Sequence, residues 1–226
     1  MTARIGQYAK YIVLLFFAFL ALYPIFLMIV SPLKSNLDIL TSPLGLPSFF
    51  SLDNYIEVWE KVNFEAYMWN SIYVSGMSVF FILFISSLAA FYLSRYSFRW
   101  NSYVLFFFML GLMLPMKLAI LPLYMIMLQL QLLDTLTSLV ILYVALATVG
   151  IVHLIGVWND FFYPLIFVKC EELSTIPLGV LKLFGEYDTE WNMLFASLTI
   201  SSMPMIIAFL FASKQFIEGL TSGAIK

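Results

Sequence analysis

Few side chains in this sequence could do chemistry, because polar residues are scarce inside its long apolar stretches. Lys117 lies between two prolines of one apolar run, and Asn159 and Asp160 lie beside Trp158 and Tyr163 in another. An ionisable side chain inside a membrane segment is energetically costly and by default faces a cavity or a partner. The alternative for Lys117 is that it snorkels to the outer interface or pairs with a neighbouring subunit. The alternative for the Asn159 and Asp160 pair is that neighbouring helices satisfy its hydrogen bonds near an aromatic belt.

No pattern typical of a catalytic or metal centre is present. The sequence has a single histidine, His153, and a single cysteine, Cys170, so zinc binding and an internal disulfide are not expected. It contains no GxSxG elbow, no phosphate-binding glycine loop and no HExxH pair. His153 is expected to be a hydrogen-bonded interior residue and not a proton relay. We therefore predict that the chain is not an enzyme and binds neither a metal nor a cofactor of its own.

The composition determines what kind of element must position these residues. Of the 226 residues, 63% are hydrophobic and 11% are charged, whereas soluble domains are about 45–50% apolar and roughly 25% charged. The mean hydropathy is +0.98. A chain with so few charges cannot face water on all sides, so the bilayer is its solvent. The formal net charge of −2 offers no basic patch for nucleic acid. The sequence therefore predicts an all-α, polytopic bundle of membrane helices.

The apolar runs predict the spans, and the basic residues predict their orientation. The clear spans are the stretches 11–33, 71–93, 102–128 and 193–213. Lysines and arginines collect on the cytoplasmic side of membrane proteins. They occur without acidic neighbours in the N-terminal head and in the turn that follows the second span, at Arg4, Lys10, Arg95 and Arg99. The acidic loop 34–69 and the short link 129–135 are then expected outside.

The length of the apolar stretch 136–168 fits neither one membrane span nor two. Its 33 residues would measure about 50 Å as one helix, against a hydrocarbon core of about 30 Å. A hairpin would leave about 15 residues per arm, below the usual minimum of about 17. As one span it would place the two chain ends on opposite sides of the membrane. A cytoplasmic C-terminus would instead require the stretch to form a strained or re-entrant hairpin.

Seven short motifs resemble, in order, those of the permease subunits of ABC-type carbohydrate importers, in the maltose-permease-like branch. They are SLDNYIEVW (51–59), NSIYVS (70–75), LAAFYLSRYSF (88–98), MLPMKLAILPLY (113–124), GVWNDFFYPLIF (156–167), TIPLGV (175–180) and QFIEGLTSGAIK (215–226). The resemblance implies the type I permease fold in the bacterial plasma membrane. One segment of the family pattern is missing. The back of the fourth span, the cytoplasmic EAA coupling loop and the head of the fifth span are absent near 145–147, which leaves about five spans instead of six.

The resemblance also implies a domain organisation. Residues 1–69 would form the first span with its external loop, 70–213 the internally truncated type-1 transmembrane domain, and 214–226 a cytoplasmic tail. The candidate residues of the substrate path are Lys117, Trp158, Asn159, Asp160 and Tyr163, with the aromatic rings available to stack on a sugar. The candidate residues for contact with the ATPase are Glu218, Gly219, Ser222, Gly223 and Lys226.

Such permeases work with several partners. The resemblance implies a second permease subunit, an ATPase dimer that binds the ATP, an extracytoplasmic sugar-binding protein and the membrane lipid, but no nucleic acid. Because the EAA loop transmits the state of the ATPase to the spans, its absence allows a second interpretation. The chain would then be a non-transporting remnant that lacks coupling to the ATPase. The sequence does not identify the sugar.

Overall fold

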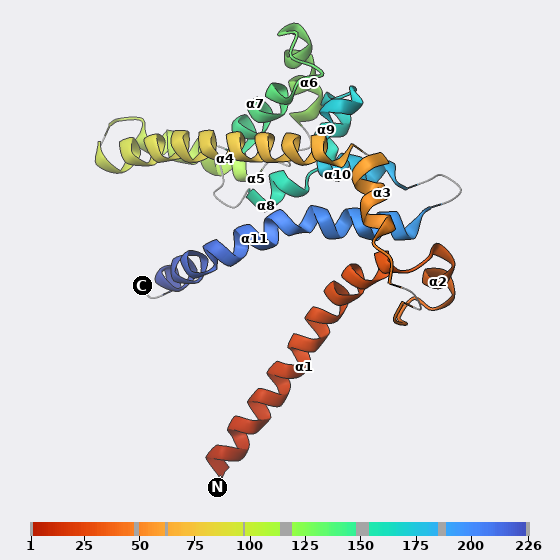
Figure 1. The fold of residues 1–226 in the computed structure, drawn as a ribbon. Helices are drawn as coiled ribbons and strands as arrows, with labels where there is room; N and C mark the ends of the chain where they lie inside the picture. The colour runs from red at the N-terminus through yellow and green to blue at the C-terminus, as the bar shows by residue number, and fades with distance from the viewer. Residues whose placement is uncertain are drawn as a thin grey trace. The chain divides into compact units, whose positions relative to one another are not determined.

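The structure is a computed structural model that describes residues 2–47, 50–61, 63–96, 98–113, 119–147, 154–184 and 189–224. Every regular element in these ranges is helical (Figure 1), which confirms the predicted all-α class. Three of the described helices are long and apolar enough to cross a membrane, over 10–33, 64–95 and 191–211. The chain divides into two compact units, one made of 1–62 with 183–226 and the other of 63–182.

The first unit combines the two ends of the chain. Its elements are α1 (Thr2–Val30), the 3-10 turn η1 (Ser31–Leu33), α2 (Asn36–Thr41), α3 (Asp53–Lys61) and α11 (Trp191–Ala224). The apolar side chains of α1 are exposed around the helix, with Leu15 69% and Phe19 66% exposed. An exposed helix of this composition is suited to lipid or to another protein and not to water.

Helix α11 extends past the predicted end of the last span. The sequence analysis placed a separate tail after residue 213, whereas the helix runs on to Ala224. The stretch after 213 contains no proline, so nothing in it forces the helix to stop. Pro204 lies inside the same helix, as is tolerated in membrane segments where neighbours satisfy the freed backbone groups.

Polar side chains tie the loop segments of the first unit together. Lys34 is only 3% exposed, and its ammonium donates hydrogen bonds to the carbonyl oxygens of Ser42 (3.2 Å) and Pro43 (3.3 Å). The Asn54 amide donates to the carbonyl of Lys34 at 3.2 Å and accepts from the amide of Asn192 at 2.7 Å. These bonds fix the start of α3 and the start of α11 to the end of α1.

The second unit holds the remaining helices. They are α4 (Phe64–Arg95), α5 (Asn101–Met113), α6 (Ile120–Gln129), α7 (Leu136–Ala147), α8 (Leu154–Asn159), α9 (Phe162–Phe167), the 3-10 turn η3 (Glu171–Leu173) and α10 (Ile176–Lys182). Val74 of α4, Met127 of α6, Leu139 and Leu142 of α7 and Phe167 of α9 share one buried core. The end of α6 therefore belongs to the same core as the first half of α4.

The overlong stretch 136–168 is not a continuous rod. Helix α7 ends at Ala147, and the described chain resumes with the short helices α8 and α9, which are separated by Asp160 and Phe161. The described part of the stretch consists of one helix of 12 residues and two of six.

Candidate functional site

Asp160 lies at the centre of the cluster predicted from the sequence. Its Oδ2 accepts a hydrogen bond of 2.6 Å from the Tyr143 hydroxyl and one of 3.2 Å from the backbone N–H of Tyr163. Its Oδ1 accepts from the backbone N–H of Phe162 at 3.2 Å. These two N–H groups open α9 and have no partner inside the helix, so the carboxylate satisfies them as a cap does. Asp160 therefore fixes the start of α9 and ties it to α7.

The aromatic residues beside Asp160 belong to the packed interior of the second unit. Trp158 is 6% and Tyr163 is 8% exposed. The rings of Tyr143 and Tyr163 meet edge to face, with centroids 5.9 Å apart and planes at 90°, which is a favourable aromatic geometry. Asn159, by contrast, is exposed. Of the predicted group 158–163, Asn159 is thus exposed and the two aromatic residues are buried.

The other predicted site residues lie either outside the described residues or at the C-terminal end of α11. Lys117 and His153 are outside the described residues, as is Lys226. The predicted ATPase contacts Glu218, Gly219, Ser222 and Gly223 lie on the last turns of α11. The backbone there is helical, and it places these four positions close together along one helix end.

The start of α4 is latched to the segment that follows α9. The Asn70 amide donates to the carbonyl oxygens of Glu172 (2.8 Å) and Ser174 (3.0 Å), and the Ser71 hydroxyl accepts from the backbone N–H of Ile176 at 2.8 Å. Asn70 and Ser71 belong to the motif NSIYVS, and their partners lie in or just before the motif TIPLGV, about 100 positions further along the chain. The sequence analysis assigned no contact between the motifs, although their shared membership in one family pattern was the available signal.

A close fit between Tyr67 and Gly179 completes this contact. The Tyr67 ring is 2% exposed, and a Cβ atom added to Gly179 of α10 would overlap it. The Tyr67 hydroxyl lies 3.4 Å from the Glu171 carboxylate, which also forms an ion pair of 3.6 Å with Lys182. Only glycine allows α10 to approach α4 this closely.

A second link joins the two ends of the stretch 136–168. The side chain of Asp134 accepts from the backbone N–H groups of Lys169 (2.8 Å) and Cys170 (2.7 Å), and its own N–H donates to the carbonyl of Phe167 at 2.8 Å. Asp134 has a φ of 61°, a left-handed conformation that aspartate adopts more readily than most residues. The sequence analysis missed this residue.

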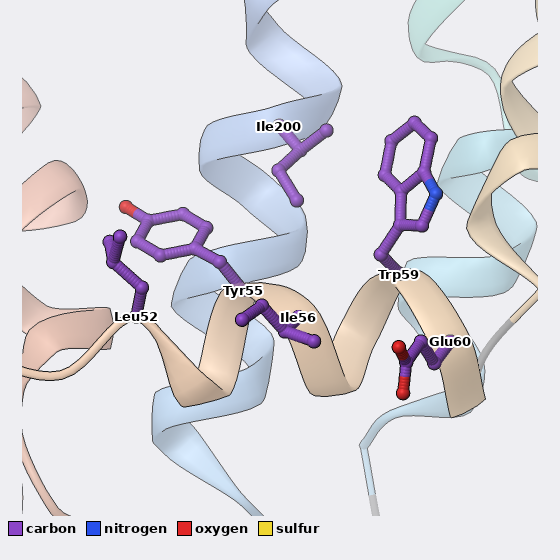
Figure 2. A pocket seen from close by; sticks show the side chains of 6 residues that line it. All are labelled: Leu52, Tyr55, Ile56, Trp59, Glu60 and Ile200. Carbon is purple, nitrogen blue, oxygen red and sulfur yellow. The ribbon is translucent and has the colours of Figure 1, made fainter.

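The first unit contains an open groove of about 420 Å³ along α3 and α11 (Figure 2). Leu52, Tyr55, Ile56, Trp59, Glu60 and Ile200 line it. The Tyr55 hydroxyl donates to the carbonyl of Ile29 at 2.9 Å, and burial raises the pKa of this hydroxyl, an effect that a hydrogen bond with Thr199 partly offsets. The lining is almost entirely apolar, which suits a hydrocarbon surface better than the hydroxyl groups of a sugar.

Among the residues that the structure describes, no group of three or more His, Cys, Asp or Glu could hold a metal ion. What the structure does contain is a set of apolar membrane helices whose connecting segments are fastened by backbone-directed hydrogen bonds. That is an architecture suited to an integral membrane protein.

The comparison with solved structures gives the fold. The chain is similar to a chain of a bacterial ABC transporter involved in the import of the acidic polysaccharide alginate, with a TM-score of 0.77 and 18% sequence identity. The match covers 96% of this chain and 98% of that one. It confirms the predicted ABC importer permease fold.

Curated relatives give the class. YurM of Bacillus subtilis, a probable ABC transporter permease protein, is 29% identical over 98% of this chain and 89% of its own length. AraQ of Halalkalibacterium halodurans, an arabinooligosaccharide transport permease, is 24% identical over 93% of each chain. No protein-family model matches the chain. The comparisons confirm that the chain is a multi-pass permease subunit of an ABC importer, in the sugar-importer branch that its motifs predict.

The alignment with YurM also bears on the missing segment. It extends over 269 positions, whereas the whole chain has 226 residues. At least 43 aligned positions therefore have no counterpart in this chain. A deficit of this kind agrees with the internal segment that the sequence analysis finds missing near 145–147.

Proposed function

We propose that this chain forms half of the path through which a bacterial plasma membrane imports an oligosaccharide, and that a second permease subunit forms the other half. The observation that carries the proposal is the similarity to a sugar permease such as AraQ over nearly the whole length of both chains. The named substrates of AraQ are arabinooligosaccharides, and the structural relative belongs to an alginate importer. Both are chains of sugar units, which is why we propose an oligosaccharide.

The partners follow from the class of protein. We expect an extracytoplasmic binding protein to deliver the sugar and an ATPase dimer to bind ATP on the cytoplasmic side. This chain would bind no nucleotide, metal or cofactor and would catalyse no covalent reaction. Its contact with the ATPase would involve the end of α11, at Glu218, Gly219, Ser222 and Gly223, together with Lys226.

Within the path, the proposal gives different tasks to neighbouring residues. Asn159 is exposed, and its amide can both donate and accept hydrogen bonds to sugar hydroxyls. The oxygens of Asp160 already accept three hydrogen bonds, so Asp160 would position Asn159 and not bind the sugar itself. Trp158 and Tyr163 would support the same loop from the interior. Lys117 would face the path or the partner subunit.

The test is a reconstituted complex of this chain with its partner permease, ATPase and binding protein. We expect the four components to co-purify and sugar-loaded binding protein to raise ATP hydrolysis in proteoliposomes. The variant Asn159→Ala should raise the KM for sugar uptake severalfold, while Thr137→Ala, which changes an exposed polar residue of α7, should leave uptake unchanged. Assembly with a flat ATPase response would mean a non-transporting remnant, and failure to assemble would overturn the proposal.

A further inference from the structure

We propose that the groove between α3 and α11 binds one acyl chain of a membrane phospholipid whose headgroup carries an ammonium ion. The groove has a volume of about 420 Å³ and is lined by Leu52, Tyr55, Ile56, Trp59, Glu60 and Ile200, all of which belong to the first unit. The inference goes beyond the proposed function, because it depends neither on the sugar that is carried nor on the ATPase.

The groove lies beside two membrane spans, inside their ends. The Tyr55 hydroxyl of α3 donates to the carbonyl of Ile29 at 2.9 Å, and the Thr199 hydroxyl of α11 donates to a backbone carbonyl of α1 at 2.9 Å. Ile29 is four residues from the end of the apolar stretch 10–33, and Thr199 is eight residues from the start of the stretch 191–211. These offsets correspond to about 6 and 12 Å along the helices. At this depth the groove faces the hydrocarbon of the bilayer.

Helix α3 presents an apolar stripe that the first unit leaves uncovered. Val58 is fully buried, whereas Leu52, Ile56 and Trp59 are 63%, 53% and 43% exposed. These three residues are spaced by four and three positions, so they share one face of the helix. Glu60 follows Ile56 by four positions and borders the same stripe. An exposed apolar stripe bordered by charge suits the membrane interface, where tryptophan and tyrosine are also enriched.

The groove has the size of a hydrocarbon chain and not that of a helix. Figure 2 shows the rings of Tyr55 and Trp59 extending from α3 on either side of Ile200 of α11. Two turns of an α-helix, about 11 Å long and about 10–12 Å wide, would need at least about 850 Å³, which is about twice the volume of the groove. The occupant that fits is an acyl chain that lies over Ile200 between the two rings, where the apolar lining favours it.

The charge on α3 determines which headgroup is preferred. Of the described residues that line the groove, Glu60 alone carries a charge, and its side chain is exposed. The helix has two further acidic residues, Asp53 and Glu57, against one lysine, Lys61. A carboxylate at the rim attracts the ammonium ion of phosphatidylethanolamine and repels the net negative charge of phosphatidylglycerol. The preference should be modest, because an exposed ion pair contributes little.

Site-specific photo-crosslinking tests the occupant. A photo-reactive amino acid replaces Ile56 in the groove or, as a reporter of bulk lipid, Leu20 of α1, which is 58% exposed. The full chain, alone and with its partner subunits, is reconstituted in vesicles of equal parts phosphatidylethanolamine and phosphatidylglycerol with identical acyl chains. Mass spectrometry then identifies the adducts. At Ile56 the ratio of phosphatidylethanolamine to phosphatidylglycerol adducts should be about threefold that at Leu20, as one exposed ion pair allows, and Glu60→Gln should abolish this difference.

A second pair of variants tests the floor of the groove. Ile200→Phe fills it and should lower the yield of lipid adducts at Ile56 severalfold, whereas Leu198→Phe, at an exposed position about 200° around the same helix, should not. Equal adduct ratios at Ile56 and Leu20, or adducts of Ile56 with a partner subunit or a second copy of the chain, would overturn the proposal. So would the absence of lipid adducts at Ile56 when Leu20 forms them. Glu60→Gln changes an exposed side chain, so it decides the question even if Ile200→Phe does not fold.

Discussion

The hydrogen bond between Tyr143 and Asp160 should hold α7 to the start of α9, and its strength can be predicted. A hydrogen bond between membrane helices contributes about 0.6 kcal/mol on average and up to about 1.7 kcal/mol. The bond here is short, at 2.6 Å, and its acceptor is a carboxylate, so Tyr143→Phe should lower the free energy of unfolding by about 1–1.5 kcal/mol. Asp160→Ala also removes the cap of α9, which is worth about 1 kcal/mol, and should cost about 2–3 kcal/mol.

The double variant separates this bond from other effects. If the two residues interact directly, Tyr143→Phe together with Asp160→Ala should cost about as much as Asp160→Ala alone, with a coupling energy of about 1 kcal/mol. Unfolding of the purified chain in bicelles can be followed by tryptophan fluorescence, to which Trp158, buried beside the cluster, contributes. Tyr124→Phe is the matched control, since Tyr124 packs on the same core and should lose less than about 0.5 kcal/mol. Strictly additive losses would refute the direct bond.

Two further changes test the latch at the start of α4. Gly179→Ala should destabilise the second unit by about 1–3 kcal/mol, because the new methyl group would overlap the Tyr67 ring. Gly156→Ala is the matched control: Gly156 has open space around it, so this change should be neutral or stabilising. The thermal stability of a fluorescent fusion of each variant compares them, and equal effects would argue against the close fit. Asn70→Ala removes both hydrogen bonds from α4 to the segment after α9, so added protease should cleave that segment faster. An unchanged cleavage rate would show that these hydrogen bonds do not hold the segment in place.

Much of the fold was predictable from local patterns. Apolar length and basic flanks give the long helices, and the motif spacing gives the permease class. The stretch 136–168 was also predictably not one ordinary span, because it is too long, and the described chain is non-helical at Asp160 and Phe161 within it. These properties depend on residues close together in the sequence, and a single sequence contains that information.

The contacts that hold the site together were not predictable in the same way. Asn70 finds its partners more than 100 residues away, and no local property of an asparagine identifies such a partner. Asp160 was assigned to the substrate path because polar residues in apolar runs are rare. Its position just before a helix with Pro164 in the first turn is a recognised helix start, so the capping role could have been considered. Asp134 carries no such signal.

The most direct test of the account restores the missing segment. A coupling loop from an intact relative, with its flanking helix ends and an epitope, is inserted between Ala145 and Leu146, where α7 nears its end. The account predicts that the lengthened region forms two full spans, that the epitope is cytoplasmic, and that the binding protein and sugar then stimulate ATP hydrolysis more strongly than with the original chain. An epitope that stays outside, or an ATPase response that does not rise although the epitope is cytoplasmic, would contradict it.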